Sequence, residues 1–174
     1  MPPAPVTLIL GGARSGKSAH AERLAATAAR PVYLATAEIR DQEMAERIAL
    51  HRARRGEAWQ TVEEPRELVT ALARHRRPEG VVLVDCLTLW LSNLMEAERD
   101  IAAETAALVA ALAAPAGPVI LVSNEVGLGL VPETPLGRRF RDHAGRLHQA
   151  VAAVADHVVL LVAGLPLVIK DASG

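Results

Sequence analysis

Eight consecutive residues near the N-terminus have the types and spacing that bind a nucleoside triphosphate. They match the pattern G-x-x-x-x-G-K-[ST], in which backbone N–H groups of a glycine-rich loop converge on phosphate oxygens. The lysine of such a loop reaches the β- and γ-phosphates, and the hydroxyl after it can ligate Mg²⁺. The residues are Gly11, Gly12, Ala13, Arg14, Ser15, Gly16, Lys17 and Ser18, with Lys17 as a catalytic group and Ser18 as a metal ligand.

The residues on either side of this phosphate loop favour a nucleotide site over an incidental glycine turn. Val6–Leu10 is an apolar run typical of a buried parallel strand, and an alanine-rich helical pattern extends from Lys17 to Ala29. A strand, a glycine-rich loop and a helix in this order bring phosphate groups to the N-terminus of the helix. A nucleoside triphosphate is therefore the expected ligand.

A phosphate loop also needs a group that positions the metal, usually an acid at the end of a nearby strand. Asp85 follows the apolar run Val81–Val84 and is the candidate, with a plain strand-end cap as the alternative. Ligands of doubly wound sheets bind at the carboxyl ends of the strands. Two further groups are therefore expected near Lys17: first Thr36, Ala37 and Glu38, and second the pair Asn124 and Glu125, which opens a glycine-interrupted loop.

A histidine among arginines is the second unusual feature. Arg47, His51 and Arg55 recur at four-residue spacing, which places them on one face of a helix. Neighbouring guanidinium groups favour the neutral, nucleophilic form of the imidazole and can bind the anion that it attacks. The alternative is a solvated helix end with Gly56 as its cap, because cations are favourable at a helix C-terminus. The spacing alone leaves both interpretations open.

The order of the predicted elements indicates a three-layer α/β fold with a mainly parallel sheet and a C-terminal antiparallel hairpin around residues 163–166. Strands are predicted at Val6–Leu10, Val32–Ala35, Val81–Asp85, Val119–Val122, His157–Val162 and Leu167–Ile169. Helices are predicted at Lys17–Ala29, Asp41–Arg55, Pro65–Arg76, Leu87–Ala97, Ile101–Ala114 and Pro135–Ala155.

Length and composition favour one cytoplasmic nucleotide-binding domain over residues 1–174. The chain has 174 residues, of which 51% are hydrophobic, enough for one sizeable core. A net charge of −1 and an aromatic content of 2% argue against a nucleic-acid partner. Apolar runs stay far below the roughly 20 residues of a membrane span. The single cysteine, Cys86, excludes an intrachain disulfide and is expected to be a small core residue.

Taken together, these segments resemble one family, the bifunctional adenosylcobinamide kinase / adenosylcobinamide-phosphate guanylyltransferases of cobalamin biosynthesis. The resemblance spans nearly the whole chain. It is carried by Gly11–Ser18, Arg47-Ile48, His51-Arg52, Trp59, Glu63, Asp85–Thr88, Leu91–Leu94, Asn124–Gly127 and Phe140–Asp142. One departure is His148-Gln149, where members commonly have Asn-Gln.

The resemblance implies a RecA-like P-loop fold and two reactions. The hydroxyl of adenosylcobinamide takes the γ-phosphoryl group of ATP or GTP. GTP then guanylylates a histidine, here His51, and the GMP passes to adenosylcobinamide phosphate with release of pyrophosphate. It also implies Mg²⁺, a homotrimer, and nucleotide contacts from Thr36, Ala37, Glu38, Arg52, Ala53, Arg54, Arg55, Glu63 and Asp85.

Two other functions remain compatible with the phosphate loop. One is a single-activity small-molecule kinase in which the arginine-rich helix is a lid over phosphates. The other is a nucleotide-dependent switch protein whose output is partner binding. The sequence does not decide whether ATP or GTP is preferred for phosphorylation, or which residues bind the corrinoid.

Overall fold

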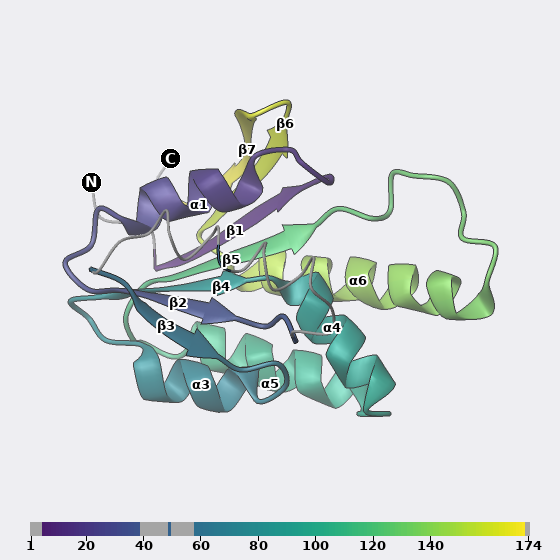
Figure 1. Cartoon of the computed structure of the whole chain (residues 1–174), viewed down its shortest axis with the longest axis horizontal. Helices are drawn as coiled ribbons and strands as arrows, with labels where there is room; N and C mark the ends of the chain where they lie inside the picture. The colour runs from purple at the N-terminus through teal and green to yellow at the C-terminus, as the bar shows by residue number, and fades with distance from the viewer. Residues whose placement is uncertain (1–4, 39–48, 50–57, 173–174) are drawn as a thin grey trace.

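The computed structural model describes residues 5–38, 49 and 58–172, and its strands form a seven-stranded sheet in the order β3-β2-β4-β5-β1-β6-β7 (Figure 1). All neighbouring strands are parallel except β6 and β7, which pair antiparallel. The mainly parallel sheet and the C-terminal hairpin are thus as predicted. The strands are β1 (Val6–Gly11), β2 (Pro31–Ala35), β3 (Gln60–Glu63), β4 (Val81–Asp85), β5 (Val119–Asn124), β6 (His157–Val162) and β7 (Leu165–Asp171).

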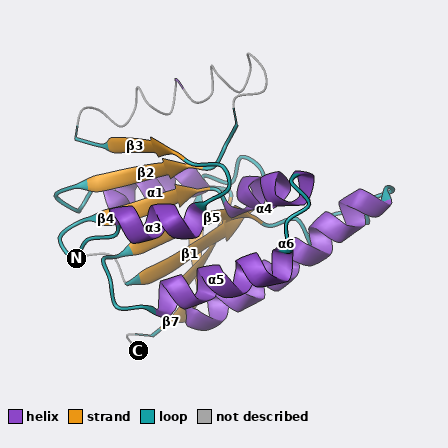
Figure 2. Cartoon of the chain, turned by 90° about the horizontal axis from the view of Figure 1, so that it is seen from below, coloured by secondary structure: helices purple, strands orange, loops and turns teal. Residues whose placement is uncertain are grey.

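The described helices lie on both faces of this sheet, which makes the fold three-layered (Figures 1 and 2). They are α1 (Lys17–Ala25), α3 (Leu68–His75), α4 (Leu87–Glu96), α5 (Ile101–Ala113) and α6 (Pro135–Val154). Helix α1 packs small side chains, Ala21 and Ala25, against Ile9 and other apolar residues of one face. On the opposite face, the other four helices contribute large side chains such as Trp90 and Leu108 to the main core. Alternate residues of each buried strand supply the two layers, as the period of a strand requires.

Helix starts differ in a way that bears on ligand binding. Helices α5 and α6 begin after side-chain caps, since Asp100 accepts the N–H of Ala103 and Thr134 accepts the N–H of Gly137. Helix α1 begins after Gly16, which has a left-handed backbone (φ 94°) and gives no side-chain cap. Helices α3 and α4 also start without a side-chain cap, but α1 alone among the described helices follows a phosphate-loop motif, whose N–H groups can bind an anion.

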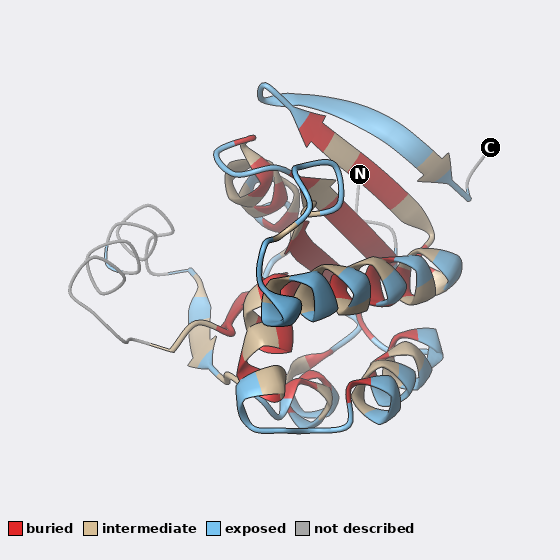
Figure 3. Ribbon diagram, turned by 90° about the vertical axis from the view of Figure 1, so that its right-hand side faces the viewer, coloured by how far each residue is buried: buried red, intermediate tan, exposed pale blue. Residues whose placement is uncertain are grey.

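The C-terminal hairpin leaves both faces of β7 and its outer edge at the surface (Figure 3). Its turn, Ala163-Gly164, has two residues with positive φ (51° and 80°), as tight two-residue hairpin turns require. Strand β7 exposes Leu165, Leu167, Val168 and Ile169, each by more than half. The hairpin prediction is confirmed, but its last strand is longer than Leu167–Ile169.

Several predicted boundaries need correction. Strand β3 was not predicted, because Gln60–Glu63 contains a single apolar residue and pairs only at the sheet edge. Helix α1 ends at Ala25 rather than Ala29. Helix α3 starts at Leu68 rather than Pro65, because the Glu64 carboxylate accepts the N–H groups of residues 66 and 67 in a turn. The predicted helix Asp41–Arg55 lies outside the described residues, apart from residue 49, which is helical. None of the described helices is both long and apolar enough to cross a membrane.

Candidate functional site

The phosphate loop follows β1 and turns sharply into α1. Arg14 and Gly16 both have positive φ, 55° and 94°. Lys17 is buried, and its Nζ donates a hydrogen bond to the backbone oxygen of Gly12 at 2.6 Å. The ammonium group is therefore held over the same loop whose backbone would surround a phosphate, where the oxygens of a triphosphate compete for it.

The loop also contains a buried hydroxyl with unused hydrogen-bonding capacity. Ser15 Oγ is buried and has no hydrogen-bond partner among the described residues. A buried polar group without a partner is costly, and in native proteins it commonly marks a place where a ligand, ion or water binds. Residues 12–14 of the same loop are exposed, so the loop is open to solvent on its outer side.

The C-terminal hairpin contacts the phosphate loop from the side of β6. Gly164 donates its N–H to the backbone oxygen of Ser15 at 3.0 Å. A Cβ at Gly16 would lie 3.3 Å from Gly164 Cα, which is tighter than an ordinary contact. The close approach and the positive φ of 94° favour glycine at residue 16, whereas at Gly164 it is the positive φ of 80° that favours glycine.

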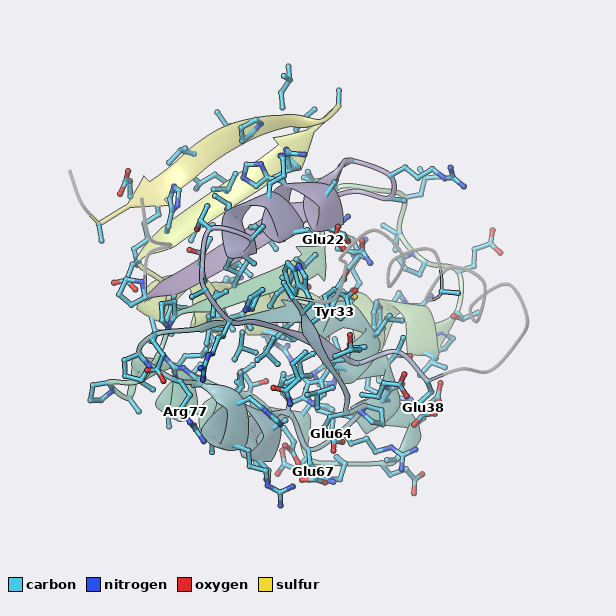
Figure 4. The ribbon with its side chains drawn as sticks, turned by 60° about the vertical axis from the view of Figure 1, so that its left-hand side comes forward. Glu22, Tyr33, Glu38, Glu64, Glu67 and Arg77 are labelled. Atoms are coloured by element: carbon cyan, nitrogen blue, oxygen red, sulfur yellow. The ribbon has the colours of Figure 1, made fainter. Side chains whose placement is uncertain are left out.

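Strand β5 lies directly between the loop strand and the strand that ends in Asp85. Asn124 pairs with Gly11 in the β1–β5 register, and the next residue, Glu125, donates its N–H to the Gly11 oxygen at 2.9 Å. On the far side of β5, Asp85 Oδ2 accepts a hydrogen bond from the buried Tyr33 hydroxyl at 2.9 Å. Figure 4 labels Tyr33, which lies in β2, and Glu38, which follows that strand.

A chain of polar side chains fixes the ends of β2, β4 and β5 relative to one another. Thr36 Oγ1 donates to the Cys86 oxygen at 2.7 Å and accepts the Cys86 N–H at 2.8 Å. Asn93 Nδ2 donates to the Thr36 oxygen at 2.8 Å, which ties α4 to β2. Asn124 Nδ2 donates to Thr88 Oγ1 at 3.1 Å, which ties β5 to α4. These bonds hold the carboxyl-terminal edge of the sheet in one arrangement.

Cys86 is buried, as expected for a small core residue. Burial raises the pKa of the thiol, and the adjacent Asp85 carboxylate raises it further. The thiol is therefore protonated near neutral pH, and thiols react mainly as thiolates. This makes Cys86 a packing residue rather than a nucleophile.

The pair Ser123 and His148 was missed from the sequence. Ser123 Oγ and His148 Nε2 are 2.7 Å apart, and both residues are buried. Burial lowers the pKa of the His148 imidazole, although the Glu125 carboxylate acts in the opposite direction. A signal was available, because His148 is the position at which the chain departs from the family pattern, but nothing in the sequence linked it to β5.

The predicted site residues fall into two groups along the sheet. Residues 11–18 lie at the end of β1 and in the loop after it, while Asp85 is the last residue of β4, two strands away. Thr36, Ala37 and Glu38 follow β2, where Thr36 is fully buried and Glu38 forms an ion pair with Arg66 at 2.9 Å. Glu63 ends β3 and pairs in register with Ala35. The predicted nucleophile and its neighbours, His51, Arg52, Ala53, Arg54 and Arg55, lie outside the described residues.

The fold and the loop together define the class of protein. A phosphate loop after an interior strand of a mainly parallel sheet, with another strand between it and the strand that ends in an acid, is typical of the RecA-like P-loop fold. Solved structures agree. A Pyrococcus horikoshii protein described as "Project ID PH0250" has a TM-score of 0.55 at 9% identity, over 96% of this chain and 86% of its own. An ATPase of a type III secretion system has a TM-score of 0.52 at 14% identity, over 90% of this chain and 50% of its own.

Comparison of sequences identifies the family. The family model described as "Cobinamide kinase / cobinamide phosphate guanyltransferase" matches residues 7–169. A Pseudomonas aeruginosa protein named "Bifunctional adenosylcobalamin biosynthesis protein CobP" is 51% identical over 94% of this chain and 96% of its own. The Escherichia coli "Bifunctional adenosylcobalamin biosynthesis protein CobU" is 43% identical over 94% of this chain and 98% of its own. The chain belongs to the cobinamide kinase / cobinamide phosphate guanyltransferase family and is a bifunctional enzyme of cobalamin biosynthesis.

Proposed function

We propose that the enzyme first phosphorylates adenosylcobinamide with ATP or GTP and then transfers GMP from GTP to adenosylcobinamide phosphate. The products of the second reaction are adenosylcobinamide-GDP and pyrophosphate. The observation that carries this proposal is a family match over residues 7–169 that includes an intact phosphate loop with a buried Lys17.

In the first reaction, the phosphate loop and Lys17 bind the β- and γ-phosphates. Phosphoryl transfer requires positioning and charge stabilisation more than covalent chemistry from the protein. The uncapped N-terminus of α1 supplies backbone N–H groups, and Lys17 supplies a positive charge close to them. Exchange of the Lys17 bond from the Gly12 oxygen to phosphate oxygens would bring the ammonium group onto the transferring phosphate.

Ser18 and Asp85 are the residues that would hold Mg²⁺ with the triphosphate. The donor set fits this metal, because Mg²⁺ prefers oxygen ligands and is usually held by one or two protein groups together with phosphates and waters. Tyr33 donates to one carboxylate oxygen of Asp85, and the other oxygen would serve the metal. When bound, Mg²⁺ would neutralise charge on the β- and γ-phosphates.

In the second reaction, His51 is the proposed nucleophile. Its imidazole would attack the α-phosphorus of GTP, and pyrophosphate would leave. Arg52, Ala53, Arg54 and Arg55 would contact the nucleotide, as would Thr36, Ala37, Glu38 and Glu63. Support comes from the grouping of the last four residues at the carboxyl ends of β2 and β3, together with the positive charge that flanks His51 in the sequence.

The test is covalent labelling with GTP carrying a radioactive α-phosphate. Wild-type protein should acquire acid-labile, base-stable label, and His51→Ala should acquire none while keeping GTP binding. His75→Ala is a matched control, because His75 lies at the end of α3 and should not affect labelling. Label that persists in His51→Ala would overturn the assignment. Absence of label in the wild type, together with γ-phosphoryl transfer, would indicate a single-activity kinase instead.

The proposal also covers domain organisation, cellular location and oligomeric state. We infer that residues 1–174 act as one nucleotide-binding domain in the cytoplasm and that the chain assembles as a homotrimer. The exposed apolar edge strand β7 supports self-association, since such strands are rarely left uncovered. Light scattering coupled to size-exclusion chromatography would measure the mass, and a monomer at micromolar concentration would contradict the trimer.

A further inference from the structure

We propose that Glu125 is the general base of the phosphorylation step and accepts the proton of the substrate hydroxyl. This inference rests on the proposed kinase reaction, in which an alcohol oxygen attacks the γ-phosphorus. The attacking oxygen must lose its proton, and a base can take it only within hydrogen-bonding reach of that hydroxyl. The question is therefore which carboxylate lies near the γ-phosphate.

The order of the strands distinguishes the candidate carboxylates by their distance from the phosphate loop. Neighbouring strands lie about 4.8 Å apart. Strand β4, which ends in Asp85, strand β2, which precedes Glu38, and strand β3, which ends in Glu63, therefore lie about 10, 14 and 19 Å from β1. Strand β5 is the direct neighbour of β1, about 5 Å away, and it ends just before Glu125. Among the described residues that follow β2, β3, β4 and β5, Glu125 is the carboxylate nearest in strand order to the phosphate loop.

The backbone connects Glu125 to the loop directly. Its N–H donates to the oxygen of Gly11, and the next carbonyl oxygen along the chain, that of Gly12, accepts Lys17 Nζ. The two groups thus bind successive peptide units, whose Cα atoms lie about 3.8 Å apart. The lysine of such a loop reaches the β- and γ-phosphates, so Glu125 is joined through one backbone hydrogen bond to the loop that binds the reacting group.

The Glu125 carboxylate is oriented by a hydrogen bond and forms no ion pair with another described residue. Its Oε1 accepts the N–H of Gly127, which fixes one carboxylate oxygen against the following loop. By contrast, Glu38 is paired with Arg66, and Asp85 accepts the Tyr33 hydroxyl and is the proposed metal ligand. Nearby His148 has a lowered pKa because of its burial and hence is neutral near pH 7.

The proposed step transfers one phosphoryl group to the substrate oxygen and one proton to Glu125. The hydroxyl oxygen forms a bond to the γ-phosphorus while the bond from that phosphorus to the β-bridging oxygen breaks. The hydroxyl proton moves to Oε2 of Glu125, and ADP or GDP leaves with the bridging oxygen. Glu125 then returns the proton to solvent. Attack of a histidine on GTP requires no such base, because the neutral imidazole nitrogen already has a lone pair.

This difference between the two reactions provides the experiment. Glu125→Gln keeps an oxygen for the Gly127 N–H but removes the basic group, and Glu133→Gln, on the exposed part of the same loop, is the matched control. Each variant is assayed for phosphorylation of adenosylcobinamide with γ-labelled GTP and, separately, for covalent labelling by α-labelled GTP. Glu125→Gln should lower kcat for phosphorylation about 10²- to 10⁴-fold, the usual contribution of a general base. It should leave KM for the corrinoid and the covalent labelling within threefold of wild type, and Glu125→Asp should recover part of the rate.

Three outcomes would overturn the assignment. One is a phosphorylation rate in Glu125→Gln within threefold of wild type. Another is a parallel loss of labelling, which would place Glu125 in nucleotide binding common to both reactions. The third is a rise confined to KM for the corrinoid, which would make it a substrate-binding residue. Failure of the proposed function is distinguishable, because then the wild-type enzyme itself would not phosphorylate adenosylcobinamide.

Discussion

Gly164 in the C-terminal hairpin turn donates its backbone N–H to the oxygen of Ser15 in the phosphate loop at 3.0 Å. The two residues are far apart in the sequence, and the bond joins the end of the fold to the beginning of the nucleotide site. The hairpin is therefore part of the support of the phosphate loop, although no residue of β6 or β7 was among the predicted site residues.

Gly164→Val should weaken both the fold and the site. Gly164 has φ 80°, and a β-branched residue in that region is strained by about 1–2 kcal/mol. Thermal unfolding should show a lower Tm, and titration calorimetry should show a severalfold weaker affinity for a non-hydrolysable triphosphate. Gly145→Ala is the control, since its helical position has open space around it and the change should stabilise the protein by about 0.5–1 kcal/mol. An unchanged nucleotide affinity in Gly164→Val would mean that the hairpin does not support the loop.

Tyr33→Phe should impair metal-dependent steps more than folding. The change keeps the ring, which packs edge-on against Trp59, and removes the hydroxyl that donates to Asp85. Loss of one such bond costs about 1 kcal/mol. We expect the Mg²⁺ concentration for half-maximal phosphorylation to rise about fivefold, with a small fall in Tm. An unaltered Mg²⁺ dependence would argue that Asp85 does not hold the metal.

Acidification should destabilise the wild type more than His148→Asn. Burial places the pKa of His148 in the folded protein below its ordinary value of about 6.5. The unfolded chain therefore binds the proton more readily, and the stability that depends on neutral His148 is present above about pH 6.5 and is lost as the pH falls below it. His20, whose pKa is lowered mainly by burial, contributes in the same direction and is common to both proteins.

Urea unfolding at pH 7.5 and pH 5.5 measures this difference. The free energy of unfolding of the wild type should fall more between the two pH values than that of the variant, which still offers an amide to Ser123. Equal losses in both proteins would show that His148 is not titrated on unfolding in this range.

Arg76→Met should affect stability without affecting the site. The buried guanidinium group donates to the backbone oxygens of Gly117 and Ala111, at 2.9 and 2.6 Å. It thereby joins the end of α3 to the last turns of α5 and to the connection before β5. Two carbonyl groups would lose their donors, at a cost of about 2 kcal/mol or more. Arg74→Met, on the exposed side of α3, should change stability by less than about 0.5 kcal/mol. Triphosphate affinity below the unfolding temperature should be unchanged in both variants. A weaker triphosphate affinity in Arg76→Met would show that the contact between α3 and α5 influences the nucleotide site.

The parts of the fold that were predictable are those in which one sequence segment determines its own structure. The phosphate loop is one example, because the glycine, lysine and serine positions and the flanking strand and helix are contiguous. Strand β4 is another, since Val81–Asp85 is apolar up to its terminal acid and the observed bounds are identical. The hairpin was predictable from Gly164 and the proline after it.

The parts that were not predictable depend on pairing between distant segments. Strand β3 has little hydrophobicity of its own and forms by parallel pairing with the neighbouring strand β2. The contact between Ser123 and His148 depends on where α6 lies against β5, and neither residue carries a local motif for it. Glu125 was expected near Lys17, but its direct bond to Gly11 required the register of β1 and β5.

The strand order also has a consequence for synthesis on the ribosome. The first strand of the chain pairs on one side with β5 and on the other with β6, so both of its neighbours are made more than 100 residues later. Contacts of such long sequence separation form slowly, because the intervening chain must first be brought together. The phosphate loop, although encoded in the first twenty residues, therefore gains both of its flanking strands only after most of the chain has been synthesised.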